Sequence, residues 1–366
     1  MNNDFQHLMT EATRLTRSGD LQAATAAIQS ALAMAGMPSP LAANDEPGSK
    51  LASDVIDVAV REVPGIDGQH QSDATGPQAA TSPQAASQFI AGNYATTAGA
   101  RDYKLFIPAG AGDKPLPLVV MLHGCTQGPD DFAAGTAMNE LAQAQGLYVL
   151  YPAQSQQANL QRCWNWFKHS HQQRGRGEPA LLAGMTRQVM AQHTVDPARV
   201  YVAGLSAGGA MAAILGDTHP DLYAAVGVHS GLAAGAASDL PSALQAMQGN
   251  GARAKASARH VPTIVFHGDA DATVHPRNGE QVAAASSAGG GEADVQPHQP
   301  PGKRRSTRSV HRDAGGKVLA EHWLVHGAAH AWSGGDARGS YTDAKGPDAS
   351  AEMLRFFLEH PRRAAQ

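Results

Sequence analysis

Residues 200–209 read VYVAGLSAGG, a short apolar run with β-branched residues that ends in Gly-x-Ser-x-Gly. The run before the serine is typical of a strand, and residues 210–215 (AMAAIL) favour a helix. Gly204 and Gly208 have no Cβ atoms, so strand and helix can approach closely around a strained serine. The pattern therefore predicts that Ser206 is a nucleophile at a sharp strand-to-helix turn.

A serine hydroxyl needs a base to remove its proton, and two later segments could supply the partners. Residues 261–271 (VPTIVFHGDAD) read as a strand that ends in aspartates, and residues 322–332 (HWLVHGAAHAW) repeat this with histidines. Polar residues just past strand ends lie where parallel α/β sheets place their sites. The chain order serine, acid, histidine resembles that of the α/β-hydrolases and predicts a triad of Ser206, Asp271 and His330.

Two alternatives to these partners remain open. Asp269 competes with Asp271, and we expect Asp271 to be the acid because Asp269 is better placed to cap the turn through its own backbone. His267 and His326 directly end strands, where we expect local hydrogen bonds. His330 lies beyond Gly327 and has the loop freedom to reach Ser206.

The fourth expected element is an oxyanion hole. Residues 116–126 (LPLVVMLHGCT) read as a buried strand that runs into His-Gly. In α/β-hydrolases one backbone N–H comes from this loop and another from the residue after the nucleophile. We assign the two donors to Cys125 and Ala207.

Several separate motifs, in order, resemble the poly(3-hydroxybutyrate) depolymerase family of esterases, which is related to feruloyl and acetylxylan esterases. The resemblance covers roughly residues 88–360. The motifs are LHGCTQ at 122–127, CWNWF at 163–167, GLSAGG at 204–209, HAWSGG at 330–335, GSYTD at 339–343 and GPDAS at 346–350.

The resemblance implies an α/β-hydrolase fold, hydrolysis of carboxylic esters without a cofactor, and the triad already assigned. It favours poly(3-hydroxybutyrate) or hydroxyalkanoate oligomers as substrate, with a feruloyl or acetylxylan-type carboxylesterase as the alternative. A different class of function is a non-catalytic, granule-associated binding protein that works through the N-terminal segment. The complete triad speaks against that class.

Composition and charge agree with a globular enzyme. The 366 residues are 42% hydrophobic, and 28 basic against 32 acidic residues give a formal charge of −4, which favours neither nucleic acid nor an anionic membrane as partner. No apolar stretch approaches the roughly 20 residues of a membrane span. The first residues show no basic region followed by a hydrophobic core, so we expect a cytoplasmic location. The resemblance offers an extracellular location as the alternative.

The chain divides into three predicted parts. Residues 1–35 carry two apolar stripes at helical spacing and predict an αα-hairpin, for which packing, self-association or granule contact are the possible roles. Residues 36–87 are rich in Ala, Pro, Gly and Ser and predict a flexible linker. Residues 88–366 predict the catalytic domain: an antiparallel strand pair, then strands alternating with helices in a mostly parallel sheet covered on both faces.

Finer expectations concern residues near the site and one insertion. Cys125 and Cys163, the 2 cysteines, either form a disulfide that closes the oxyanion loop or stay as buried free thiols. Trp164 and Trp332 either line a substrate groove or belong to the core. We expect no metal site, with His169 and His171 exposed and unliganded. We also expect a surface insertion over residues 288–305, with the basic run at 303–305 in solvent.

Overall fold

The computed structural model of the protein describes residues 11, 86–96, 99–251, 261–288 and 290–362. The chain divides into two units, Met1–Pro77 and Gln78–Gln366. All described residues except Glu11 belong to the second unit. The helical hairpin predicted over 1–35 and the linker predicted over 36–87 lie outside the described residues, apart from Glu11, Ala86 and Ser87.

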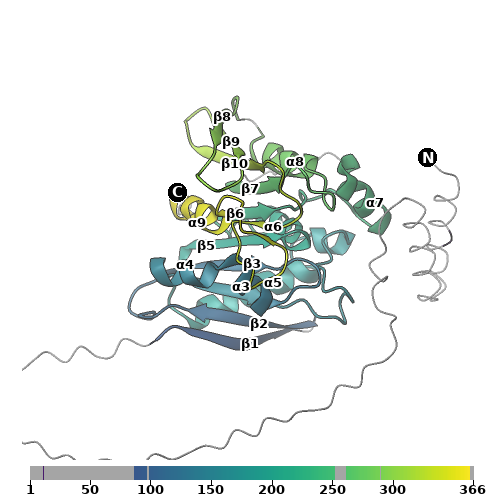
Figure 1. Ribbon diagram of the computed structural model, residues 1–366. Helices are drawn as coiled ribbons and strands as arrows, with labels where there is room; N and C mark the ends of the chain where they lie inside the picture. Colours follow the sequence, from purple (N-terminus) through teal and green to yellow (C-terminus); the bar gives the residue numbers. More distant parts are fainter. Residues whose placement is uncertain (1–10, 12–85, 97–98, 252–260, 289, 363–366) are drawn as a thin grey trace, which may run out of the picture. The chain divides into compact units, whose positions relative to one another are not determined.

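A largely parallel sheet of ten strands organises the described residues (Figure 1), in the order β1-β2-β4-β3-β5-β6-β7-β10-β9-β8. The six strands from β4 to β10 in this order pair in parallel, and the pairs at both edges are antiparallel. The strands are β1 (Gln88–Thr96), β2 (Gly99–Ile107), β3 (Leu116–Leu122), β4 (Tyr148–Pro152), β5 (Val195–Leu205), β6 (Ala225–His229), β7 (Thr263–Gly268), β8 (Asp294–His298), β9 (Ser306–Arg312) and β10 (Val318–Val325), and a separate short pair is formed by β11 (Trp332–Ser333) and β12 (Thr342–Asp343).

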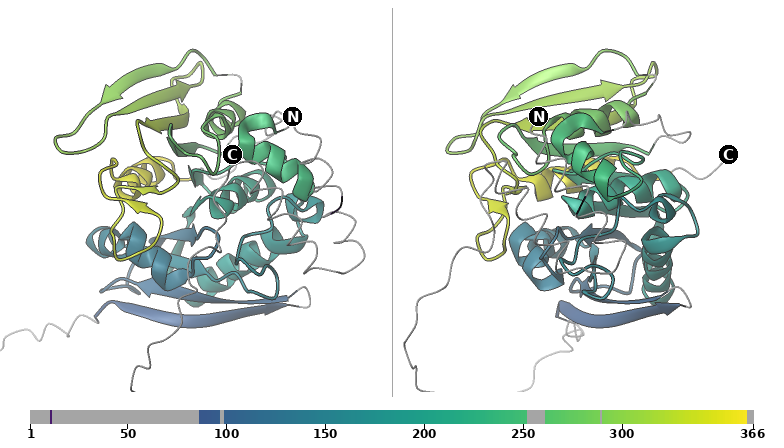
Figure 2. Two further views of the ribbon diagram at one scale, coloured as in Figure 1. Left: turned by 45° about the vertical axis from the view of Figure 1, so that its right-hand side comes forward. Right: turned by 90° about the vertical axis from the view of Figure 1, so that its right-hand side faces the viewer.

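Helices cover both faces of this sheet, as Figure 2 shows. The helical segments are α3 (Pro129–Thr136), α4 (Met138–Gln145), η1 (His169–Gln172), α5 (Gly177–Gln192), α6 (Ala207–Thr218), α7 (Leu240–Gln245), η2 (Ala246–Asn250), α8 (Arg277–Ser286) and α9 (Ala349–Glu359). None of the helices in the described part of the chain has the length and apolar character that crossing a bilayer requires.

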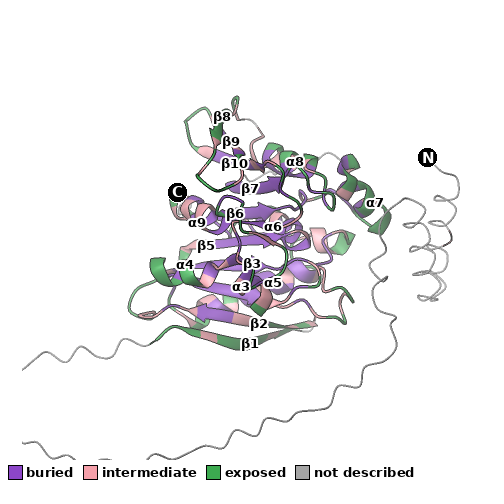
Figure 3. Cartoon of the chain, in the orientation of Figure 1, coloured by how far each residue is buried: buried purple, intermediate pink, exposed green. Residues whose placement is uncertain are grey.

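Alternating side chains of the central strands pack against opposite helix layers. On β3, Val120 belongs to a core with α5, α6 and α8, whereas Val119 belongs to a second core with α3, α4 and α9. This period of two is what a strand buried on both faces requires. Figure 3 shows the result, with buried central strands and more exposed outer strands β1 and β8.

The structure confirms the predicted antiparallel pair at the start of the domain, since β1 and β2 pair with Phe89 opposite Phe106. Helices α3 and α4 are separated at Ala137, which adopts a left-handed φ of 49°. The segment expected as a surface insertion over 288–305 is exposed over most of β8, but this strand pairs with β9 and extends the sheet beyond β10.

In the basic run, Lys303 and Arg305 are exposed as expected, and Arg304 is partly buried. Arg304 Nε donates to Asp343 Oδ2 over 2.6 Å, and Lys303 Nζ donates to the Ala344 carbonyl over 2.8 Å. These contacts attach the segment to the chain near β12.

Candidate active site

Ser206 stands at the turn between β5 and α6. Its φ of 57° and ψ of −120° lie in a region that L-residues rarely adopt, at a cost of about 1–3 kcal/mol. The two glycines make the turn possible: a Cβ on Gly208 would lie 2.0 Å from the Leu122 carbonyl oxygen, and one on Gly204 would lie 2.4 Å from Gly208. The backbone thus holds the serine at the carboxyl edge of the parallel sheet, as predicted from the Gly-x-Ser-x-Gly pattern.

Asp271 and His330 meet at the same edge. Asp271 follows β7 and His330 follows β10, which is paired with β7 in parallel. His330 Nδ1 donates to Asp271 Oδ2 over 2.7 Å, with the Asp271 side chain fully buried and the His330 side chain 13% exposed. The contact fixes the ring so that Nε2 is the nitrogen free to take a proton.

Asp271 is held as an anion. Burial would raise its pKa, but hydrogen bonds from His267 and His330, together with the Val274 amide, outweigh burial and hold the pKa below its usual range. The other carboxylate oxygen, Oδ1, accepts the Thr273 and Val274 amides over 2.9 and 2.8 Å. A buried carboxylate with these donors can stabilise a positively charged imidazole.

Asp269 forms a second pair, with His326. His326 Nδ1 donates to Asp269 Oδ2 over 2.8 Å, and the Gly327 amide donates to Oδ1 over 2.6 Å. Our reason for preferring Asp271 was wrong, because Asp271 caps its own turn whereas Asp269 binds the loop after β10. The expected local bonding of His267 is present, since its Nε2 donates to the Val274 carbonyl over 2.8 Å.

The structure joins Asp271 to His330, but among the hydrogen bonds of the described residues none links Ser206 Oγ to His330. A third histidine lies between their segments. The carbonyl of His229, the last residue of β6, accepts the Ser206 amide over 2.9 Å, and His229 Nε2 accepts the Ser333 amide over 2.9 Å. His229 thereby ties the nucleophile turn to the loop that carries His330.

His229 was missed in the sequence. Burial lowers the pKa of His229 to about 3, so the ring stays neutral and Nε2 can accept a hydrogen bond. The ring stacks on Phe266 and Trp332, with centroids 5.8 and 5.0 Å away. The one available signal was its place at the end of the strand next to the nucleophile strand.

The residues assigned to the oxyanion hole flank Ser206. We call residues 123–126 the oxyanion loop. A Cβ on Gly124 of this loop would lie 3.6 Å from the Ser206 Cβ, so the loop lies against the nucleophile. Ala207 is the first residue of α6, where a backbone N–H has no intrahelical acceptor. Outside the helices and strands, no hydrogen bond of the described residues uses the Cys125 amide as donor.

The two cysteines form a disulfide, which settles the alternative of free thiols. Cys125 and Cys163 are bonded across 38 residues, with their Cα atoms 4.2 Å apart. The Thr126 amide donates to the Gln161 carbonyl over 2.6 Å beside the bridge. The oxyanion loop is therefore fastened to the segment that carries the CWNWF motif.

The two tryptophans expected to line a substrate groove are buried in the domain. Trp332 is 1% exposed, and its Nε1 donates to Ser350 Oγ over 3.0 Å. Trp164 is completely buried, packs on His123 and has no acceptor for its Nε1. The structure thus favours the core alternative over an exposed groove for both rings.

The expected exposure of the histidines in η1 holds only for His169. His171 is partly buried, and its Nδ1 lies 3.4 Å from Glu178 Oε2. Within the described ranges, no cluster of three or more His, Cys, Asp or Glu side chains could hold a metal ion.

Comparison with known proteins places the chain in a family. Residues 101–305 match the family model described as esterase PHB depolymerase. Poly(3-hydroxyalkanoate) depolymerase C of Paucimonas lemoignei is 31% identical over 251 residues, which cover 65% of this chain and 60% of that protein. Acetylxylan esterase A of Talaromyces purpureogenus is 27% identical over 195 residues, 48% of this chain and 50% of that protein. The chain thus spans only part of the length of these relatives.

A solved structure has a similar fold. Acetyl xylan esterase from Aspergillus awamori superimposes with a TM-score of 0.56 at 18% identity, covering 70% of this chain and 94% of that chain. This likeness confirms the expected α/β-hydrolase fold. With more than half of its residues matched by the family model, the chain belongs to the poly(3-hydroxybutyrate) depolymerase family of esterases.

Proposed function

We propose that the protein is a serine hydrolase of carboxylic esters, with residues 88–366 as its catalytic domain. Ser206 Oγ attacks the ester carbonyl while His330 Nε2 takes its proton, and Asp271 stabilises the imidazolium. The Cys125 and Ala207 amides bind the oxyanion, a contribution of about 3–4 kcal/mol for each donor in other hydrolases. The alcohol leaves with the proton from His330, and water then releases the acid from Ser206.

The observation that carries this proposal is the buried Asp271–His330 pair at the sheet edge that also bears the strained Ser206. The site lacks a direct bond between Ser206 and His330, and catalytic hydrogen bonds often tighten only when substrate binds.

For the substrate, we propose a hydroxyalkanoate oligomer or polymer. Support comes from the family model and from the depolymerase of Paucimonas lemoignei. A second candidate is an acetylated or feruloylated polysaccharide, which the similarity to acetylxylan esterase A favours.

The test is a panel of esters assayed with the wild type and with Ser206→Ala. We expect hydrolysis of hydroxybutyrate oligomers and short p-nitrophenyl esters, both abolished in the variant while its circular dichroism is unchanged. Faster turnover of feruloyl or acetylxylan esters would select the second candidate. Appreciable turnover by Ser206→Ala would refute the nucleophile.

For location, we propose an oxidising compartment, the extracellular alternative, instead of the cytoplasm expected from the sequence. The Cys125–Cys163 disulfide supports this change, because disulfides persist outside reducing cytosol. Thiol titration of protein isolated under denaturing conditions tests this location. Two free thiols in each molecule would instead favour the cytoplasm. Granule contact or self-association through residues 1–35 is a proposal to be tested separately, by removing those residues.

A further inference from the structure

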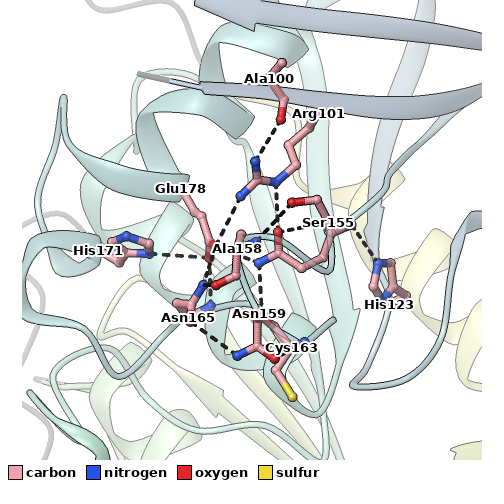
Figure 4. A network of polar contacts seen from close by, with 11 residues as sticks. Ala100, Arg101, His123, Ser155, Ala158, Asn159, Cys163, Asn165, His171 and Glu178 are labelled. Carbon is pink, nitrogen blue, oxygen red and sulfur yellow. Dashed lines mark hydrogen bonds and ion pairs between the residues drawn. The ribbon is translucent and has the colours of Figure 1, made fainter. Parts of the chain in front are cut away.

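Glu178, the second residue of α5, is a buried carboxylate that the proposed chemistry does not use. Its side chain is 3% exposed and receives three hydrogen bonds, from Gln154 Nε2 at 2.6 Å and from the backbone and side-chain nitrogens of Asn165, both at 2.7 Å. Arg101 and His171 complete the set at 3.7 and 3.4 Å, as Figure 4 shows. Helix α5 also favours an anion at this end.

These contacts keep Glu178 ionised. Burial would raise its pKa, but the contacts with His171, Gln154 and Asn165 outweigh burial and hold the pKa below its usual value. The donors come from β2, from the segment after β4 and from the segment after Cys163. A single charge thus joins β2 to two nearby segments between β4 and α5.

One route leads from Glu178 through Gln154 to the oxyanion loop. The backbone amide of Gln154 donates to His123 Nε2 over 3.1 Å. In the neutral ring the proton is therefore on Nδ1, which donates to the Gly124 carbonyl over 2.7 Å. Burial lowers the pKa of His123 to about 4, which keeps this arrangement at neutral pH.

A second route runs through the disulfide. Gln154 Nε2 also donates to the Cys163 carbonyl over 3.0 Å, and Cys163 is bonded to Cys125 of the oxyanion loop. Two residues of the oxyanion loop, His123 and Cys125, are therefore attached to residues that Glu178 holds.

We propose that Glu178 is a positioning residue for ester hydrolysis, whose carboxylate fixes the oxyanion loop so that the Cys125 amide meets the negative oxygen of the transition state. The inference rests on the proposed function. Among the described residues, Glu178 has no hydrogen bond or ion pair with Ser206, His330 or Asp271, so it acts through the loop alone.

The replacement Glu178→Gln tests the charge at nearly constant size. Its amide nitrogen would face groups that are themselves donors, so the network loses at least one hydrogen bond. Because the oxyanion contact forms fully only in the transition state, we expect kcat to fall about 10-fold or more while KM changes less than about 2-fold.

A matched control is Glu321→Gln. Glu321 is another buried carboxylate, held by Arg308 and Arg355 over 2.7 Å, but it lies in the middle of β10 and has no bond to the oxyanion loop. We expect both variants to lower Tm and only Glu178→Gln to lower kcat. Equal kcat values per folded molecule in the two variants would overturn the proposal.

Two further measurements keep the outcome decisive. Labelling of Ser206 by a fluorophosphonate counts active molecules, so a loss of folded protein is separated from slower turnover. If Glu178→Gln fails to fold, Gln154→Met replaces it as the test, because it removes the side-chain bonds from Gln154 to Cys163 and Glu178. A kcat equal to that of Glu321→Gln would again overturn the proposal. Turnover by Ser206→Ala equal to wild type would instead refute the proposed function itself.

Discussion

His229 connects the turn at Ser206 to the segment that carries His330 and Ser333. The contribution of its ring to stability and activity can be tested. His229→Phe keeps an aromatic ring between Phe266 and Trp332 but leaves the buried Ser333 amide without an acceptor. We expect a loss of about 1–3 kcal/mol in the free energy of unfolding, together with a lower kcat. Urea titration and ester assays measure both effects.

The control for this variant is His322→Phe. His322 is also buried, on β10, which β7 separates from β6, and its Nε2 has no hydrogen-bond partner in the described part of the chain. We expect the control to be less destabilised and to retain kcat. A His229→Phe enzyme as stable and active as the control would show that the bridge to Ser333 is dispensable.

Asp271 gives the protein a defined sensitivity to acid. Its folded-state pKa lies below that of an unfolded aspartate, about 3.9, so its stabilising contribution is complete above that pH and is lost as pH falls through the folded value. Between about pH 5 and 2, the free energy of unfolding should therefore fall more steeply for wild type than for Asp271→Asn. Parallel curves would contradict the assignment of an ionised, hydrogen-bonded Asp271.

Residue order predicted part of this site and could not predict the rest. Asp271 and His330 were chosen because they follow strand ends in the right order, and the structure brings these two into contact. Which aspartate caps its own turn was predicted wrongly, since this depends on loop geometry. His229 could not be predicted, because its partner Ser333 is 104 residues away in the chain. Glu178 could not be predicted, because its partners lie in irregular segments that carry no periodic pattern.

The nucleophile turn depends on backbone contact that only glycine permits. A Cβ on Gly208 would lie within 2.0 Å of a carbonyl oxygen of β3, so Gly208→Ala must displace backbone. We expect a loss of about 3 kcal/mol in the free energy of unfolding and little remaining activity. Gly291→Ala is the control, because a Cβ there meets nothing within 4 Å. Equal stability of the two variants would contradict the close approach of α6 and β3.

The disulfide fastens the oxyanion loop to the segment after β4. Since the chain has 2 cysteines, a reductant acts on this bridge alone. Closing 38 residues is worth about 4 kcal/mol in the loop-entropy model. We expect dithiothreitol to lower both Tm and kcat, and the double variant Cys125→Ala, Cys163→Ala to be insensitive to it. An unchanged kcat in the reduced enzyme would show that the bridge does not position the loop.

The strands buried on both faces and the edge pair of β1 and β2 were predicted, but the edge strands β8 and β9 were not. The apolar runs in β3, β5 and β7 are typical of strands that are buried on both faces of the sheet. Strand β9 has mostly polar, partly exposed residues, and β8 contains Pro297, so neither gives an apolar pattern.

The family model covers residues 101–305, and within the sheet the strand order brings residues that are far apart in the sequence to one edge. The strand order places β5, β6, β7 and β10 side by side. Ser206, Asp271 and His330 follow β5, β7 and β10, and His229 is the last residue of β6. Residues 1–77 form a separate unit, for which the sequence prediction of residues 1–35 as a helical hairpin remains a prediction.

The most direct test of the account is to react the intact protein with a fluorophosphonate and locate the adduct by mass spectrometry of its peptides. We expect one adduct, on Ser206, which is slowed by His330→Gln and absent from Ser206→Ala. Stoichiometric labelling of a different residue, or no labelling of a protein that still hydrolyses esters, would contradict a Ser206 acyl-enzyme.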